Sequence, residues 1–336
     1  MIPTQVGSAT TVAEFSNSMV YAAMLALVAA MIAFAVAFAV RRSDSVDLRE
    51  SRRALVAVQA SGAAGDAASR ALESRPQPPP DTRGRRAGNI GLSLSWLATI
   101  LLLVAVITRA SWAGRVPWGN MYEFSVSSAL AILLVYLAVS VRRDLRWLGV
   151  FLIPLVLLTL GLATTVLYTE TQQLVPALDS YWLVIHVSMA ILCGAAFLIA
   201  GTTAALYLMA RWAQGPVKGP VSQRLSEIGQ RLPAPVVLEQ FTYRLIAFAF
   251  PVWTFAVVAG AIWAESAWGR YWGWDPKETW AFITWVVFAS YLHAQSTAGW
   301  KGRRAAWLAV IGLATYVFNY FGVNLFFTGL HSYGGV

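Results

Sequence analysis

The side chains best suited to bind a metal ion are His186, His293 and His331, the three histidines of the chain. Imidazole nitrogen is the commonest metal ligand among protein side chains. His186 and His293 lie inside long apolar runs, and His331 directly follows one. Because an ionisable group inside a membrane is rare and usually functional, we interpret these histidines as candidate ligands rather than as packing residues.

The second candidate binding feature is the aromatic segment 268–280, which carries four tryptophans within thirteen residues. Tryptophans at a membrane edge often form only an interfacial belt, but four in one short loop with two glycines exceed what a belt needs and favour contact with a flat apolar ligand. The segment contains Asp275-Pro276-Lys277-Glu278, which is typical of a helix start with Asp275 at the N-cap and Glu278 completing a capping box. Capping alone is sufficient to explain both carboxylates.

These residues belong to a strongly apolar chain. Hydrophobic residues make up 58% of the 336 residues, charged residues make up 12%, and the mean hydropathy is +0.59. This composition excludes an ordinary soluble domain and predicts an all-α, polytopic integral membrane protein. The single cysteine, Cys193, lies in an apolar run and can form no disulfide within the chain.

About eight apolar stretches are long enough to cross a hydrocarbon core of about 30 Å. They are residues 19–40, 89–109, 122–141, 148–168, 181–210, 241–263, 278–297 and 305–327. We therefore predict three regions: an N-terminal transmembrane helix within 1–40, a cytoplasmic flexible Arg- and Pro-rich linker at 41–88, and a seven-helix core at 89–336.

The distribution of positive charge predicts the orientation of the chain. Twenty of the 25 Lys and Arg residues lie in four loops that fall on one side when the spans alternate, namely 41–88, 142–147, 211–238 and 298–304. The positive-inside rule makes this side cytoplasmic, so both termini are expected to be extracytoplasmic. The net charge of +9 is thus a topology signal of a multi-pass cell-membrane protein in its lipid bilayer, and no nucleic-acid partner is predicted.

Depth in the membrane divides the histidines into two sites. At a rise of about 1.5 Å per residue, His186 lies about 8 Å below the outer boundary, and His331 follows the last span on the same side. His293 lies about 22 Å below the outer face, which is too deep to share a site with either. Two axial imidazoles must face one iron atom from opposite sides. We therefore predict an outer two-histidine site and a deeper half-site at His293, completed by a methionine or by a partner subunit.

The pattern Trp268-Gly269-x-x-Trp272-x-Trp274-Asp275-x-Lys277-Glu278-x-Trp280 resembles the tryptophan-rich "WWD" signature of the haem-handling proteins of cytochrome c maturation. The segments 120–123, 176–186 and 329–333 are most similar to the CcsA/ResC family of the System II cytochrome c synthase, which includes the actinobacterial CcsB type. The resemblance covers about residues 89–336. It implies that His186 and His331 ligate haem b above the WWD surface and that His293 belongs to a deeper haem site.

The resemblance also implies a function and partners. The chain would bind haem, move it to the extracytoplasmic face and present it for thioether attachment to the Cys-x-x-Cys-His motif of apocytochrome c, together with a ResB-type membrane subunit. Thiol-reducing thioredoxin-like proteins would be further partners. The expected haem-binding residues are His186, His331, His293, Trp268, Gly269, Trp272, Trp274, Asp275, Trp280, Arg270 and Lys277. Arg270, Lys277 or Arg115 would meet the haem propionates.

The resemblance makes the chain a subunit of a holocytochrome c synthase (haem lyase), although the sequence assigns no catalytic residue. Two other functions stay open. A haem exporter or chaperone resembling CcmC and CcmF would handle haem without ligation activity. A membrane acyl- or quinone-enzyme would use Asp275 or Glu278 as an acid or base, which is an unnecessary role because capping already explains both.

Overall fold

The computed structural model describes residues 4–40, 82–169, 179–216 and 219–331. The secondary structure of these residues is helical, which confirms the all-α prediction. The helices are α1 (Thr4–Val40), α4 (Thr82–Ala113), α5 (Met121–Ser140), α6 (Arg146–Thr165), α7 (Tyr181–Trp212), α8 (Pro220–Gln230), α9 (Pro235–Trp268), α10 (Pro276–Ser296), α11 (Arg303–Val317), the π-helical turn η2 (Phe318–Gly322) and α12 (Val323–Phe326). Residues 41–81 of the predicted linker lie outside the described residues, and its last residues form the start of α4 instead of flexible chain.

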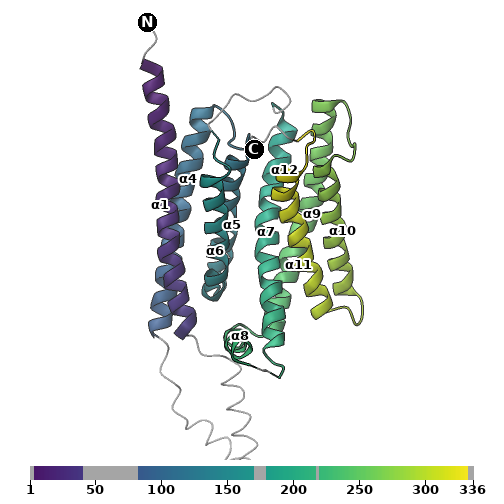
Figure 1. The fold of residues 1–336 in the computed structure, drawn as a ribbon. Coiled ribbons are helices and arrows are strands. Elements are labelled where there is room, and N and C mark those ends of the chain that lie inside the picture. Colours follow the sequence, from purple (N-terminus) through teal and green to yellow (C-terminus); the bar gives the residue numbers. More distant parts are fainter. Residues whose placement is uncertain (1–3, 41–81, 170–178, 217–218, 332–336) are drawn as a thin grey trace, which may run out of the picture.

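Seven helical segments of the described residues are long and apolar enough to cross a membrane, which confirms a polytopic membrane protein. They are Val12–Val40, Thr82–Ala113, Met121–Ser140, Arg146–Thr165, Tyr181–Trp212, Pro235–Trp268 and Arg303–Phe326. These seven correspond to seven of the about eight predicted spans. Residues 278–297 do form a helix, α10, but polar residues such as Glu278, His293 and Gln295 lower its hydropathy. Figure 1 shows that α10 nevertheless runs beside α9 and α11 along much of their length.

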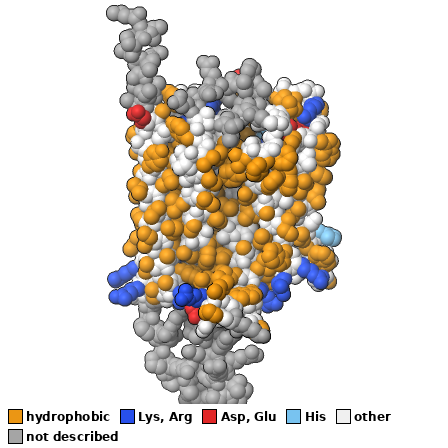
Figure 2. All heavy atoms as spheres, viewed as in Figure 1, with side chains coloured by type: hydrophobic (Ala, Val, Ile, Leu, Met, Phe, Trp, Pro, Cys, Tyr) orange, Lys and Arg blue, Asp and Glu red, His pale blue; other side chains and the backbone are white. Residues whose placement is uncertain are grey.

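The helices form two groups that are joined through α5 and α7 (Figure 1). Helices α1, α4, α5 and α6 make up one group, and α7, α9, α10 and α11 make up the other. Helix α8 lies across one end of the bundle. On the face drawn in Figure 2, most Lys and Arg side chains gather at that end, while hydrophobic side chains cover the body of the molecule. This distribution agrees with the one-sided placement of basic loops in the sequence.

Helix α1 is an integral part of its group because Phe34 inserts between two glycines. A Cβ atom at Gly91 of α4 would lie 2.7 Å from the Phe34 ring, and one at Gly149 of α6 would lie 2.6 Å from it. The ring is fully buried and meets Tyr136 of α5 edge-on, with ring centroids 6.4 Å apart. Any larger side chain at either glycine would therefore push α1 away from the bundle.

Candidate functional site

The aromatic loop between α9 and α10 is fixed at both ends by its own sequence. Gly269 caps α9 in the left-handed region at φ 70°, where glycine is favoured. Helix α10 begins with the predicted capping box, in which Asp275 accepts a hydrogen bond from the backbone N–H of Lys277 at 3.4 Å and donates its own backbone N–H to Glu278 Oε2 at 3.1 Å. Glu278 Oε2 also accepts from the backbone N–H of Gly273 at 2.8 Å. The predicted helix start is confirmed, and the buried Glu278 carboxylate ties the loop to the helix.

A cavity lies where α5, α7, α9, the aromatic loop and the segment after α12 meet. Its empty volume, including the open mouth, is about 1230 Å³. The predicted site residues on its wall are His186, His331, Trp268, Trp272 and Lys277. The structure thus brings together the two outer histidines and part of the aromatic loop in one concave, largely apolar site, as is typical of small-molecule binding sites.

His186 approaches the cavity from α7 against the backbone of α9. Its Nδ1 atom lies 2.7 Å from the carbonyl oxygen of Ala256. Because a carbonyl oxygen can only accept, Nδ1 carries the proton and donates it, and the lone pair of the neutral ring lies on Nε2. The close approach requires a glycine on α9, since a Cβ atom at Gly260 would lie 2.7 Å from both Cε1 and Nδ1 of His186.

His331 is held at the cavity by Asp275 at the start of α10. Its Nδ1 atom lies 2.8 Å from Asp275 Oδ2, and Asp275 Oδ1 accepts a second hydrogen bond from the backbone N–H of Leu330 at 2.8 Å. Burial raises the pKa of the Asp275 carboxyl, but the hydrogen bonds from His331, Leu330 and the backbone of Lys277 outweigh burial and bring this pKa below its ordinary value. The carboxyl is therefore ionised at neutral pH.

Trp263 of α9 contacts both histidine rings. It stacks nearly parallel to His186, with centroids 6.5 Å apart, and meets His331 at 5.8 Å. Trp268 adds an edge contact to His331 at 4.9 Å. Trp263 was not predicted as a site residue, because it lies at the end of a continuous apolar run. No local pattern in the sequence marks it, because its two histidine partners lie on α7 and on the segment after α12.

The cavity has further wall residues that the sequence analysis did not assign to the site. They are Trp118, Gly119, Asn120, Met121, Phe124, Trp253, Trp263, Tyr271, Glu278, Tyr316, Asn319, Tyr320 and Asn324, together with small and apolar residues of α7, α9 and α10. Several of them follow one another on α11, η2 and α12, so the π-helical turn helps to shape this wall.

Other predicted site residues lie outside the cavity wall, namely Gly269, Arg270, Trp274, Asp275, Trp280 and His293. The Trp274 ring is exposed and meets Trp272 edge-on at 5.7 Å. Trp280 packs on Phe318 at 4.3 Å. His293 is exposed near the C-terminal end of α10, far along that helix from the aromatic loop. The cavity wall includes His186 and His331 but not His293, and the deeper site at His293 stays a prediction.

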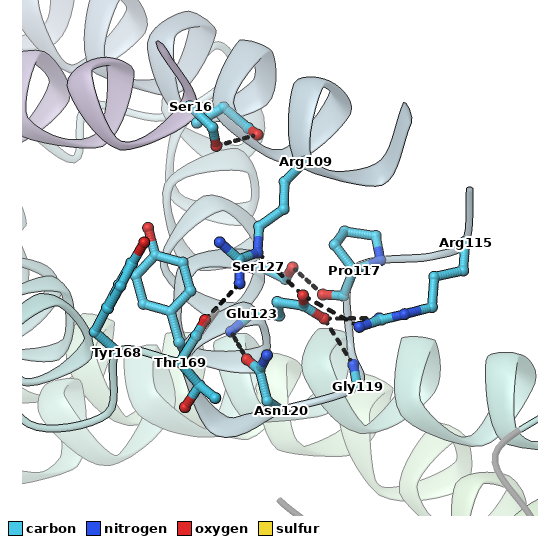
Figure 3. Close-up of polar contacts among 12 residues, drawn as sticks. Ser16, Arg109, Arg115, Pro117, Gly119, Asn120, Glu123, Ser127, Tyr168 and Thr169 are labelled. Atoms are coloured by element: carbon cyan, nitrogen blue, oxygen red, sulfur yellow. Dashed lines mark hydrogen bonds and ion pairs between the residues drawn. The ribbon is translucent and has the colours of Figure 1, made fainter. Parts of the chain in front are cut away.

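A buried ion network holds the loop before α5 (Figure 3). The Glu123 side chain, in the first turn of α5, is fully buried and accepts from Arg109 Nε at 3.0 Å, from Arg115 Nη1 at 2.8 Å and from the backbone N–H of Gly119 at 2.8 Å. Asn120 caps α5 by accepting from the backbone N–H of Glu123 at 2.8 Å. Because Gly119 and Asn120 are wall residues of the cavity, this network positions one side of it.

The three cations expected near the haem propionates differ in their surroundings. Arg115 is paired with Glu123, and Arg270 Nη1 lies 3.3 Å from Glu278 Oε1. Lys277 is the one of the three on the cavity wall.

His186 and His331 line an aromatic cavity, and this donor set fits iron held in a flat macrocycle. Within the described ranges, no group of three or more His, Cys, Asp and Glu side chains could hold a metal ion. Two imidazoles at one aromatic cavity are the axial set that haem iron takes.

Comparisons with known proteins identify the family. The family model of the cytochrome c assembly protein matches residues 118–331. The cytochrome c biogenesis protein CcsA of Trieres chinensis is 36% identical over 276 residues, which cover 74% of this chain and 88% of that protein. CcsA of Synechococcus sp. (strain JA-2-3B'a(2-13)) is 35% identical over 298 residues, covering 72% of this chain and 85% of that protein.

A solved structure shares the fold. The cytochrome c haem lyase CcmF superposes with a TM-score of 0.61 at 16% identity over 92% of this chain and 46% of that one. At this identity the similarity concerns the fold alone. The resemblance seen in the aromatic segment is confirmed by the family match and the two relatives: the chain belongs to the cytochrome c assembly protein family, which places it in cytochrome c biogenesis.

Proposed function

We propose that the cavity binds haem b as a substrate at the extracytoplasmic face and presents it for attachment to apocytochrome c. The observation that carries this proposal is that His186 and His331, far apart in sequence, both line one aromatic cavity and both contact Trp263. Each ring has its Nδ1 atom within hydrogen-bond distance of an acceptor. The lone pair of each neutral ring then lies on Nε2, as an axial ligand requires.

Each part of the wall has a role in this proposal. Trp263, Trp268 and Trp272 offer flat apolar surface to the macrocycle. The ammonium group of Lys277 would meet a propionate, because it is on the wall while the neighbouring arginines pair with glutamates. Trp274 and Trp280, which lie outside the wall, would support the loop rather than contact the substrate.

Haem would reach this cavity from a second site at His293. This histidine is exposed on α10, so a ResB-type subunit could contribute the opposite ligand to a haem held between the two chains. The positive-inside orientation puts His293 nearer the cytoplasmic side and the cavity nearer the extracytoplasmic side.

The attachment reaction needs no net redox change. Each reduced thiol of the apocytochrome Cys-x-x-Cys-His motif would add across one vinyl group of haem. The S–H bond and the vinyl π bond break, a C–S bond forms at one vinyl carbon, and the other carbon takes up a proton that balances the one lost by the thiol. Thioredoxin-like proteins would keep the two thiols reduced before the addition. The residues of this chain would hold the porphyrin in place and keep its vinyl edge accessible, which is a contribution of orientation.

The test is co-expression of the chain with its ResB-type partner and a reporter apocytochrome. We expect purified complex to show the spectrum of haem with two histidine ligands, and His186→Ala or His331→Ala to lose it. Added imidazole should restore the spectrum, which separates a missing ligand from a misfolded protein. A His186→Ala/His331→Ala double variant that matures the reporter at the wild-type level without imidazole would refute the proposal. Bound haem without thioether-linked reporter would favour the exporter function instead.

A further inference from the structure

We propose that Asp275 is a positioning residue that holds His331 in the Nδ1–H tautomer and makes it the stronger electron donor of the two outer histidines. This inference rests on the proposed function, because it concerns His331 as a haem ligand. It assigns to Asp275 a role beyond helix capping and beyond direct contact with the macrocycle.

The Asp275 carboxylate joins two segments that are distant in sequence. One oxygen, Oδ1, accepts from the backbone N–H of Leu330 at 2.8 Å, and the other, Oδ2, accepts from His331 Nδ1 at 2.8 Å and from the backbone N–H of Lys277 at 3.4 Å. The side chain is only 5% exposed. The segment that carries Leu330 and His331 approaches Asp275 so closely that a Cβ atom at Gly329 would lie 2.5 Å from Oδ1 of Asp275. A glycine at this position therefore makes the contact possible.

Capping alone does not account for this geometry. An N-cap residue needs one acceptor oxygen for the first turn of its helix, and Asn or Ser supplies it about as well as Asp. Asp275 uses two oxygens, and both strong bonds go to the segment of Leu330 and His331 rather than to α10. The acceptor-only character of a carboxylate is what this arrangement needs, because every group facing it is a donor.

The hydrogen bond to a carboxylate decides which ring nitrogen of His331 carries the proton. With Nδ1–H donating to Asp275, the lone pair lies on Nε2. Leu330 and His331 bond different oxygens of Asp275, and an amide at this position has one oxygen and one NH₂ group, so in the same geometry one of the two donors faces the NH₂ group. If its NH₂ group turns toward the ring, Nδ1 must accept and the proton moves to Nε2, which removes the ligand lone pair. A carboxylate-to-amide exchange beside a functional histidine is known to trap the wrong tautomer in this way.

The two outer histidines are therefore unequal. His186 donates to a neutral carbonyl, that of Ala256, whereas His331 donates to an anion. A carboxylate partner raises the basicity of a metal-bound imidazole, and loss of such a partner typically costs about 10–100-fold in affinity. His331 should thus hold the iron more tightly than His186 does. It should also favour the ferric state, so removal of the carboxylate should raise the reduction potential.

The first experiment measures the tautomer in haem-free protein. The chain has three histidines, so ¹⁵N-histidine labelling gives at most six ring-nitrogen signals, and the signals of His331 are assigned as those missing from His331→Ala. We expect the Nδ1–H form of His331 in the wild type and its loss in Asp275→Asn. Glu278→Gln is the matched control, since Glu278 caps the same helix and bonds the same loop, and it should leave the tautomer of His331 unchanged.

The second experiment measures haem affinity and reduction potential in the complex with its partner. We expect Asp275→Asn to weaken haem binding at the cavity about 10–100-fold and to raise the potential. Asp275→Ser, which keeps a capping oxygen, should behave in the same way if Asp275→Asn does not fold.

The outcomes separate this inference from the proposed function. The role of Asp275 would be overturned if the His331 ring kept Nδ1–H in Asp275→Asn and Asp275→Ser and the haem affinity stayed within twofold of the wild type. This holds even if His331 binds haem. A different outcome is also possible: the Asp275 variants lose the Nδ1–H form in haem-free protein, but His331→Ala leaves haem binding unchanged. That result would support the positioning role of Asp275 and refute His331 as the haem ligand.

Discussion

The close approach of His186 to α9 makes Gly260→Ala the most informative single substitution. The added Cβ would lie 2.7 Å from Cε1 and Nδ1 of the ring, whereas carbon atoms in favourable contact are about 3.5–4.0 Å apart. The imidazole must therefore retreat by about 1 Å. Its hydrogen bond to the Ala256 carbonyl, now 2.7 Å, would then exceed the length of a hydrogen bond.

Two effects on stability oppose each other in this variant. Replacing glycine by alanine inside a helix stabilises by about 0.5–1 kcal/mol. Overpacking a close contact costs about 1–3 kcal/mol, and loss of the hydrogen bond adds to that cost. We expect a net loss of about 1–2 kcal/mol in the free energy of unfolding. Because a misplacement of about 1 Å can cost about 100-fold in a positioned reaction, maturation of the reporter should fall much more than stability does.

Two other glycines serve as matched controls, each changed to alanine and measured by haem spectrum and by thermal unfolding in detergent. At Gly161 of α6 nothing lies within 4 Å of the added Cβ, so we expect a small stabilisation and normal haem binding. At Gly312 of α11 the added Cβ would lie 2.8 Å from the Phe288 ring, so we expect destabilisation with less effect on haem. Wild-type haem affinity and spectrum in Gly260→Ala would refute the argument that His186 needs this approach.

Further predictions concern the ion network, the aromatic wall and the exposed histidine. Glu123→Gln leaves two arginines without their shared anion, and should lower the free energy of unfolding by about 3–5 kcal/mol in chemical denaturation; a loss below about 1 kcal/mol would contradict a buried network. Trp263→Leu should weaken haem binding more than Trp274→Leu, because only the first ring contacts both outer histidines; equal losses in a titration would argue against this assignment. His293→Ala should block haem transfer in the complex while leaving the thermal stability of the isolated chain unchanged. Ser290→Ala, also exposed on α10, should leave both unchanged. Normal transfer in His293→Ala would refute the deeper site.

The sequence predicted those features that depend on residues close to one another along the chain. Apolar run length indicated the helices, and Asp275 with Glu278 indicated the start of α10, because capping involves residues three positions apart. Residues 278–297 form the predicted helix, α10, whose polar residues keep it outside the seven helices that are apolar enough to cross a membrane. Depth arithmetic separated His293 from the other two histidines, because rise per residue is the same in every helix.

The residues that the sequence did not predict are those brought together by packing. Trp263 contacts both histidines only because α7 and the segment after α12 meet α9, and no local pattern reports such contacts. Arg115 was expected near a propionate from its charge and side of the membrane, but its geometry directs it to Glu123. Asp275 was predicted as a helix cap and, through the resemblance, as a haem-binding residue. Its bond to His331 depends on a segment more than fifty residues away.

The separation of the two imidazoles along the chain has a consequence for biosynthesis. His186 leaves the ribosome early, while its counterpart at position 331 follows every span described for this protein. The cavity is therefore complete only after the final helices have been inserted and the segment beyond α12 has reached Asp275. A nascent or prematurely terminated chain exposes one imidazole without the other. Under the proposed function, tight capture of iron porphyrin would therefore report that membrane insertion has finished.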